Sequence, residues 1–178
     1  ASAIIAVACS AITIKTLVGY SDIRRSRKII VGLLVVVGWF APLLVGLVRD
    51  SGLFGPEAFA VVSKILYLMF GTVFILFSML LFRDVVWFAL YWIYSKIFGE
   101  NWKLHPKNIN LLDKANFIVV LLTAVLASMA VYGGAREPEL KRLEFASARI
   151  SKDMRIVMIN DTHINRTTPV ETVRKLVD

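Results

Sequence analysis

The stretch that decides the fold is Ile29–Val48, which reads IIVGLLVVVGWFAPLLVGLV. It holds twenty consecutive residues without a charge. A helix needs roughly twenty apolar residues to cross a hydrocarbon core of about 30 Å. The stretch therefore predicts a transmembrane helix, in which Pro42 introduces at most a kink.

The composition of the whole chain supports this interpretation. Of its 178 residues, 57% are hydrophobic and 19% are charged, and the mean hydropathy is +0.69. A typical soluble domain is about a quarter charged. These values exclude a disordered chain, and the single cysteine, Cys9, excludes a disulfide scaffold.

Further apolar stretches surround the first one. Ile65–Phe82 and Ala115–Ala135 carry no charge, and the former extends back past Lys64. We predict a mainly α fold, with a four-helix transmembrane domain over residues 1–135. The predicted spans are about 1–20, 29–48, 58–82 and 115–135. Three spans plus a remnant of another are the alternative, because the first segment has no flanking sequence before it.

An aromatic segment follows the third predicted span. Its rings are those of Trp87, Phe88, Tyr91, Trp92 and Tyr94. Because aromatic rings favour the headgroup zone, we predict an interfacial segment over 85–98. It either continues the preceding helix or lies along the membrane surface, and an aromatic cofactor or lipid pocket is the alternative. The adjacent charges at positions 83 and 84 predict the point where the chain leaves the hydrocarbon.

The basic residues of the loops predict the orientation. The first and third loops hold five Lys or Arg each, whereas the second holds one. Cytoplasmic loops carry the excess of basic residues, so loops one and three are expected inside, and the residues after 135 outside. The cluster Arg24-Arg25-Ser26-Arg27-Lys28 suits topology or anionic lipids better than nucleic acid, since it adjoins a span. We expect no nucleic-acid partner. The spans hold no paired Asp, Glu or His, which argues against a transporter.

The composition changes after Ala135. The 43 residues from 136 to 178 hold 16 of the 34 charged residues. We predict a juxtamembrane linker, a strand over about 140–149, a second strand over 154–160 and a helix that begins near Thr168. In such α/β units ligands gather beyond the carboxyl ends of the strands. Asp161 and His163 follow the second strand, and their oxygen and nitrogen atoms suit Zn, Mn or Fe. A turn-capping Asp161 beside a surface His163 is the alternative.

The segment MRIVMINDTHI at Met154–Ile164 resembles the first motif of calcineurin-like metallophosphoesterases. Several spans before that motif resemble the membrane-anchored bacterial branch of this superfamily. The chain departs from the pattern at Asn160, where Ser is frequent, and at Asn165, near which a Gly is usual. The resemblance implies that Asp161 and His163 bind one of two divalent metal ions (Mn, Zn or Fe) in an α/β domain that begins after residue 136.

The resemblance also implies a function. We expect an integral membrane enzyme that hydrolyses a phosphate ester, with a lipid-linked substrate as the inference from its location, in a bacterial inner or plasma membrane. Membrane lipids are the other expected partners. The remaining metal motifs would follow Asp178, so we expect this chain alone to hold an incomplete site and to be inactive, and no catalytic residue is assigned. A non-enzymatic membrane anchor with a short interaction tail is the alternative.

Overall fold

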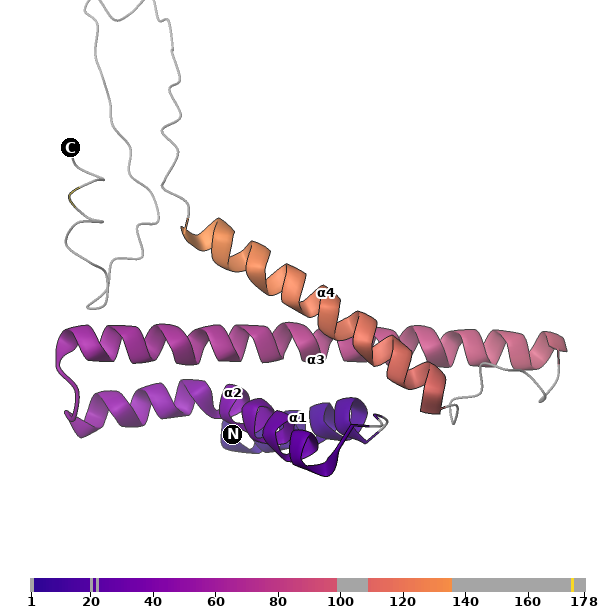
Figure 1. Cartoon of the computed structure of the whole chain (residues 1–178), viewed down its shortest axis with the longest axis horizontal. Helices are drawn as coiled ribbons and strands as arrows, with labels where there is room; N and C mark the ends of the chain where they lie inside the picture. The colour runs from indigo at the N-terminus through magenta and orange to yellow at the C-terminus, as the bar shows by residue number, and fades with distance from the viewer. Residues whose placement is uncertain (1, 20, 22, 99–108, 136–173, 175–178) are drawn as a thin grey trace, which may run out of the picture. The chain divides into compact units, whose positions relative to one another are not determined.

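The computed structural model describes residues 2–19, 21, 23–98, 109–135 and 174. They form four α-helices, labelled in Figure 1: α1 (Ser2–Val18), α2 (Arg25–Ser51), α3 (Pro56–Phe98) and α4 (Ile109–Ala135). The described part of the chain is all-α and contains no strand. The strands and helix predicted after residue 136 lie outside it, apart from Arg174, which is helical and exposed.

Three of the four helices are long and apolar enough to cross a membrane, which suggests a multi-pass membrane protein. They are α2, α3 and α4. The fourth, α1, is apolar but has 17 residues, or about 26 Å at 1.5 Å per residue. The four predicted apolar helices are therefore present, but a membrane crossing by α1 stays a prediction.

The connection between α2 and α3 follows from three residues. Gly52 ends α2 with φ of 63°, a left-handed conformation that glycine adopts without steric cost. Pro56 then opens α3, where its fixed φ suits a helix and its missing N–H is not needed. Glu57 in the first turn complements the helix dipole. The two helices are thus joined by only a few residues and pack against each other (Figure 1).

The longest helix departs most from its predicted bounds. The sequence predicts a span over 58–82, whereas α3 continues without a break to Phe98 and has 43 residues. Of the two predicted forms of segment 85–98, the continuing helix is the one observed. At 1.5 Å per residue α3 is about 64 Å long, roughly twice the thickness of a hydrocarbon core. Arg83 and Asp84 therefore lie within a helix and not at its end.

The core lies where α1, α2 and α3 meet. Its buried members are Ala6 from α1, Val35 and Trp39 from α2, and Val73 from α3. Gly38 brings α2 and α3 together, because a Cβ atom there would lie 2.6 Å from Cγ2 of Val73. Small residues at such a point let helices approach closely, which is how apolar helices pack in a membrane.

Candidate functional site

A buried amide joins three of the helices. Asn116 of α4 is 3% exposed. Its Nδ2 donates hydrogen bonds to the carbonyl oxygens of Leu17, at 3.2 Å, and of Thr16, at 3.4 Å. Its Oδ1 accepts a hydrogen bond from the guanidinium group of Arg83 in α3. One side chain therefore links α1, α3 and α4, and we call these contacts the polar junction.

The amide completes the end of α1. The last four carbonyl groups of a helix have no partner within it. In α1 the carbonyl of Lys15 accepts from the N–H of Gly19, and that of Val18 accepts from the N–H of Ser21. The two carbonyls between them accept from Asn116. Every one of these terminal carbonyls is therefore satisfied, half of them by a residue about a hundred positions away.

The charge at the polar junction is balanced within α3. The side chain of Arg83 is 8% exposed and its Nη2 lies 2.5 Å from Oδ1 of Asp84, which is 47% exposed. The Nε of Arg83 also donates to the same oxygen, at 2.9 Å. Charge-assisted hydrogen bonds of this kind are stronger than neutral ones. The pair is therefore a neutral unit with its positive end buried and its negative end toward the surroundings.

These contacts place several helix ends together. The C-terminal turn of α1, the first turns of α4 and residue 83 of α3 all meet at Asn116. A few residues after α1 ends, α2 begins at Arg25. The polar junction therefore marks the end of the bundle at which both predicted cytoplasmic loops begin. On α4 the buried residues recur on one face from this point, at Leu112, Asn116, Val119 and Thr123.

A second polar contact lies deeper among the helices. Trp39 of α2 is 7% exposed and its Nε1 donates to Oγ1 of Thr13 in α1, at 3.3 Å. Thr13 is fully buried and its hydroxyl donates to the carbonyl of Cys9, at 2.7 Å. The indole ring meets the rings of Phe70 and Phe77 of α3 edge to face, with centroids 5.9 and 5.4 Å away. Trp39 thus contacts both neighbouring helices.

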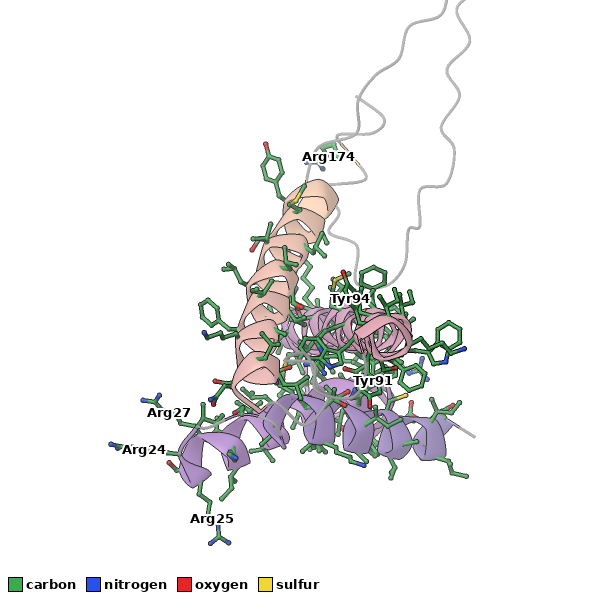
Figure 2. The ribbon with its side chains drawn as sticks, turned by 90° about the vertical axis from the view of Figure 1, so that its right-hand side faces the viewer. Arg24, Arg25, Arg27, Tyr91, Tyr94 and Arg174 are labelled. Carbon is green, nitrogen blue, oxygen red and sulfur yellow. The ribbon has the colours of Figure 1, made fainter. Side chains whose placement is uncertain are left out.

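A basic cluster stands at the start of α2. Arg24, Arg25 and Arg27 are exposed, and Figure 2 shows their side chains pointing away from the helix, those of Arg24 and Arg27 to the left and that of Arg25 downward. Lys28 follows them and is half-buried. The first turn of α2 contains no acidic residue. The positive charge of this end is therefore not neutralised within the helix that carries it.

The predicted metal ligands cannot be compared with this geometry. Asp161 and His163 lie outside the described residues, as does His105, the other histidine of the chain. Within the residues that the structure does describe, no group of three or more His, Cys, Asp or Glu side chains is placed to hold a metal ion. The assignment of Asp161 and His163 as metal ligands stays a prediction.

Comparison with known proteins adds no identification. No protein-family model, no curated protein and no solved structure matches the chain.

Asn116 is a buried polar residue of the described helices for which the sequence alone predicts no role. A signal for it exists, because Asn116 is the one amide side chain in the uncharged run Ala115–Ala135. Arg83 and Asp84, which are adjacent in the sequence, form an ion pair within α3. The burial of Arg83 against another helix was not foreseen. An ionisable residue buried among apolar helices is a candidate functional residue, and here the junction it forms is structural.

Proposed function

We propose that this chain is the membrane-anchored N-terminal part of a metallophosphoesterase. The observation that carries the proposal is the sequence Met154–Ile164, in which an apolar run ends in Asp161-Thr162-His163. The three long apolar helices that precede this motif agree with the layout of a membrane-anchored enzyme. The proposed reaction is hydrolysis of a phosphate ester outside the cytoplasm, in a bacterial inner or plasma membrane.

The proposed chemistry assigns one role to both motif residues. A carboxylate oxygen of Asp161 and a ring nitrogen of His163 would hold the same divalent ion, Mn, Zn or Fe. In two-metal sites of this kind the metals, about 3.5–4 Å apart, activate water and stabilise the attacking and leaving oxygens of an in-line displacement.

The helices supply the location of the reaction. A soluble domain that follows directly on a span stays within reach of the membrane surface. A lipid-linked phosphate ester is therefore the substrate class that suits this enzyme. In this proposal the described helices anchor and position the soluble domain and do not take part in the chemistry.

The metal assignment is tested by Mn²⁺ binding to the whole 178-residue chain in detergent micelles, measured by electron paramagnetic resonance of the free ion. We expect the unaltered chain to deplete free Mn²⁺, and Asp161→Asn and His163→Ala each to abolish most of that depletion. His105→Ala is the matched control, because it removes the only other histidine and is expected to bind like the unaltered chain.

Two results count against the proposal. Equal Mn²⁺ depletion by the unaltered chain and by the Asp161→Asn/His163→Ala double variant would remove both residues as ligands. Loss of binding in the His105→Ala variant would move the site to the loop between α3 and α4. In either case the non-enzymatic alternative, a membrane anchor with an interaction tail, becomes the better interpretation.

A further inference from the structure

The basic cluster at the start of α2 combines high charge with exposure. It has four cations within five positions, Arg24 to Lys28, and three of them are exposed arginines. Among the described residues, none of these three arginines makes an ion pair or a side-chain hydrogen bond. Guanidinium groups suit phosphate because their planar donors match its oxygens. Within the described part of the chain, which excludes the nearby Asp22, the cluster therefore offers guanidinium donors to an anionic group.

Apolar side chains continue along the same faces of the helix. Residues three or four apart lie on one face, so Arg25 is followed there by Ile29 and Leu33, which are 65% and 62% exposed. Arg27 is followed in the same way by Ile30 and Leu34, which are 58% and 52% exposed. Each of these faces begins with an arginine and continues with two exposed aliphatic side chains. This order matches a molecule with an anionic head and long apolar chains.

The polar junction fixes where this surface lies. Arg25 begins α2 a few residues after the end of α1, and that end is bound to Asn116 beside Arg83. With the arginines of α2 at headgroup depth, Ile29 and Leu33, one and two turns further along the helix, would reach into the hydrocarbon.

We propose that the start of α2 is a binding site for an anionic phospholipid. Arg24, Arg25 and Arg27 together supply the positive charge that attracts the anionic headgroup, while the two faces that carry Ile29/Leu33 and Ile30/Leu34 contact the acyl chains. A nucleic acid or a free phosphate would use only the arginines and leave the aliphatic faces uncovered, which is why the lipid is the occupant that fits both parts. The site is independent of the metal ligands proposed for the tail.

The test uses the whole 178-residue chain, purified in detergent and equilibrated with equal amounts of dioleoyl phosphatidylglycerol and dioleoyl phosphatidylcholine. Native mass spectrometry gives the ratio of the two lipids bound. We expect the unaltered chain to favour phosphatidylglycerol. A basic residue at a membrane surface contributes about a fivefold gain in anionic-lipid affinity, so R24Q/R25Q/R27Q is expected to bring the ratio close to one.

Two matched variants separate local charge from total charge. R49Q/K64Q/K96Q removes the same number of charges from α2 and α3 away from the cluster, and it is expected to keep the preference. R24K/R25K/R27K keeps the charge at the cluster and is expected to keep most of the preference. Equal loss in R24Q/R25Q/R27Q and R49Q/K64Q/K96Q would overturn the site, because it would show a response to net charge alone.

Two further arms test the nature of the ligand. Dibutyryl phosphatidylglycerol, which has the same headgroup and short chains, is expected to compete poorly with the dioleoyl lipid. Inorganic phosphate or a short single-stranded oligonucleotide that competes as effectively as the dioleoyl lipid would overturn the lipid assignment.

If the triple glutamine variant loses its helical circular dichroism signal, the single variants R25Q and R27Q decide the result. Each is expected to lower the ratio of bound phosphatidylglycerol to phosphatidylcholine about fivefold. No drop in either single variant overturns the proposal.

Discussion

At the scale of the residue, the hydroxyl of Thr13 carries two contacts at once. It donates to the carbonyl of Cys9 within α1 and accepts from Nε1 of Trp39 in α2. Threonine is common in apolar helices because its hydroxyl can bond back to the preceding turn. The second contact is what distinguishes Thr13, since it fixes the rotation of α1 against α2.

We expect Thr13→Val to lower the stability of the bundle by about 0.6 kcal/mol, and by about 1.7 kcal/mol at most, because the shape is kept and the acceptor is lost. Thermal unfolding in micelles, followed by circular dichroism, measures this. Trp39→Phe removes the donor from the other side. In the double variant the two losses are expected to be less than additive, and full additivity would show that the hydrogen bond contributes nothing.

Asn116 carries a larger share of the structure than Thr13. Replacement by leucine leaves a guanidinium donor and two helix-terminal carbonyls without their partner. A buried group left unsatisfied costs about 1–3 kcal/mol. Asn116→Leu is therefore expected to lower the unfolding temperature clearly, measured in the same way. Asn110→Leu is the control, because Asn110 is exposed on the same helix. An equal effect of both substitutions would contradict the importance of the polar junction.

The residue scale is where the sequence predicted least. A run of apolar residues reveals a helix but does not show which of its side chains face a neighbour. Asn116 and Trp39 acquire their roles only from partners that lie 26 to 100 positions away. Pairing across such distances depends on how the helices pack, and no local pattern in one sequence contains that information.

At the scale of the element, α2 and α3 depend on a close approach at Gly38. The nearest atoms to a Cβ added at this position would be Cγ2 and Cβ of Val73, at 2.6 and 3.2 Å, and then the carbonyl oxygen of Met69, at 3.3 Å. The Gly38 carbonyl is also the one whose usual partner in the helix would be the N–H of residue 42, which proline lacks. The turn from Gly38 to Pro42 thus lacks a side chain at its first residue and one backbone hydrogen bond of the helix.

Gly38→Ala is expected to destabilise the bundle by about 1–3 kcal/mol through overpacking against Val73. Gly46→Ala is the matched control on the same helix, because a Cβ atom there has no heavy atom within 4 Å. The double variant G38A/V73A should recover much of the lost stability, since it shortens the Val73 side chain with which the added methyl group would clash. Thermal unfolding of the four proteins measures both effects, and a G38A protein as stable as G46A would refute the close approach.

Helix existence was predictable at this scale, but helix ends were not. Hydrophobic runs locate α2, α3 and α4, because about twenty apolar residues are needed to cross a membrane. Charges then suggested that the third span ends near residue 83. In the structure α3 continues to Phe98, since Arg83 and Asp84 neutralise each other and neither breaks a helix. The pattern of charges therefore does not mark a helix terminus, and the membrane boundary near residue 83 stays a prediction.

At the scale of the whole molecule, the polar junction and the basic cluster belong to one end of the bundle. The loop-charge argument predicts that this end is cytoplasmic, because basic residues are retained on that side. The structure contributes the grouping of the ends, since Asn116 ties the end of α1 to α4 and to Arg83. The candidate site at 161–163 lies outside the described residues, so its prediction still depends on the sequence alone.

Single cysteines test this arrangement in a Cys9→Ala background, in cells labelled with a membrane-impermeant maleimide. Ser26→Cys and Lys114→Cys are expected to be protected from outside and labelled after lysis, whereas Gly55→Cys is expected to be labelled from outside. All three positions are exposed. Labelling of Ser26→Cys and Lys114→Cys on opposite sides would show that the two predicted cytoplasmic loops do not share a side.

The polar junction also bears on the order in which the protein is assembled. The ribosome makes α1 and α3 before α4. Until α4 is made, the side chain of Asn116 is therefore missing as a hydrogen-bond partner for the carbonyls of Thr16 and Leu17 and the guanidinium of Arg83. In that interval Asp84, the next residue in the chain, already neutralises Arg83. Helices α1 to α3 can therefore enter the bilayer without an uncompensated charge at Arg83, and the insertion of α4 is the event that brings the amide of Asn116 to its three partners.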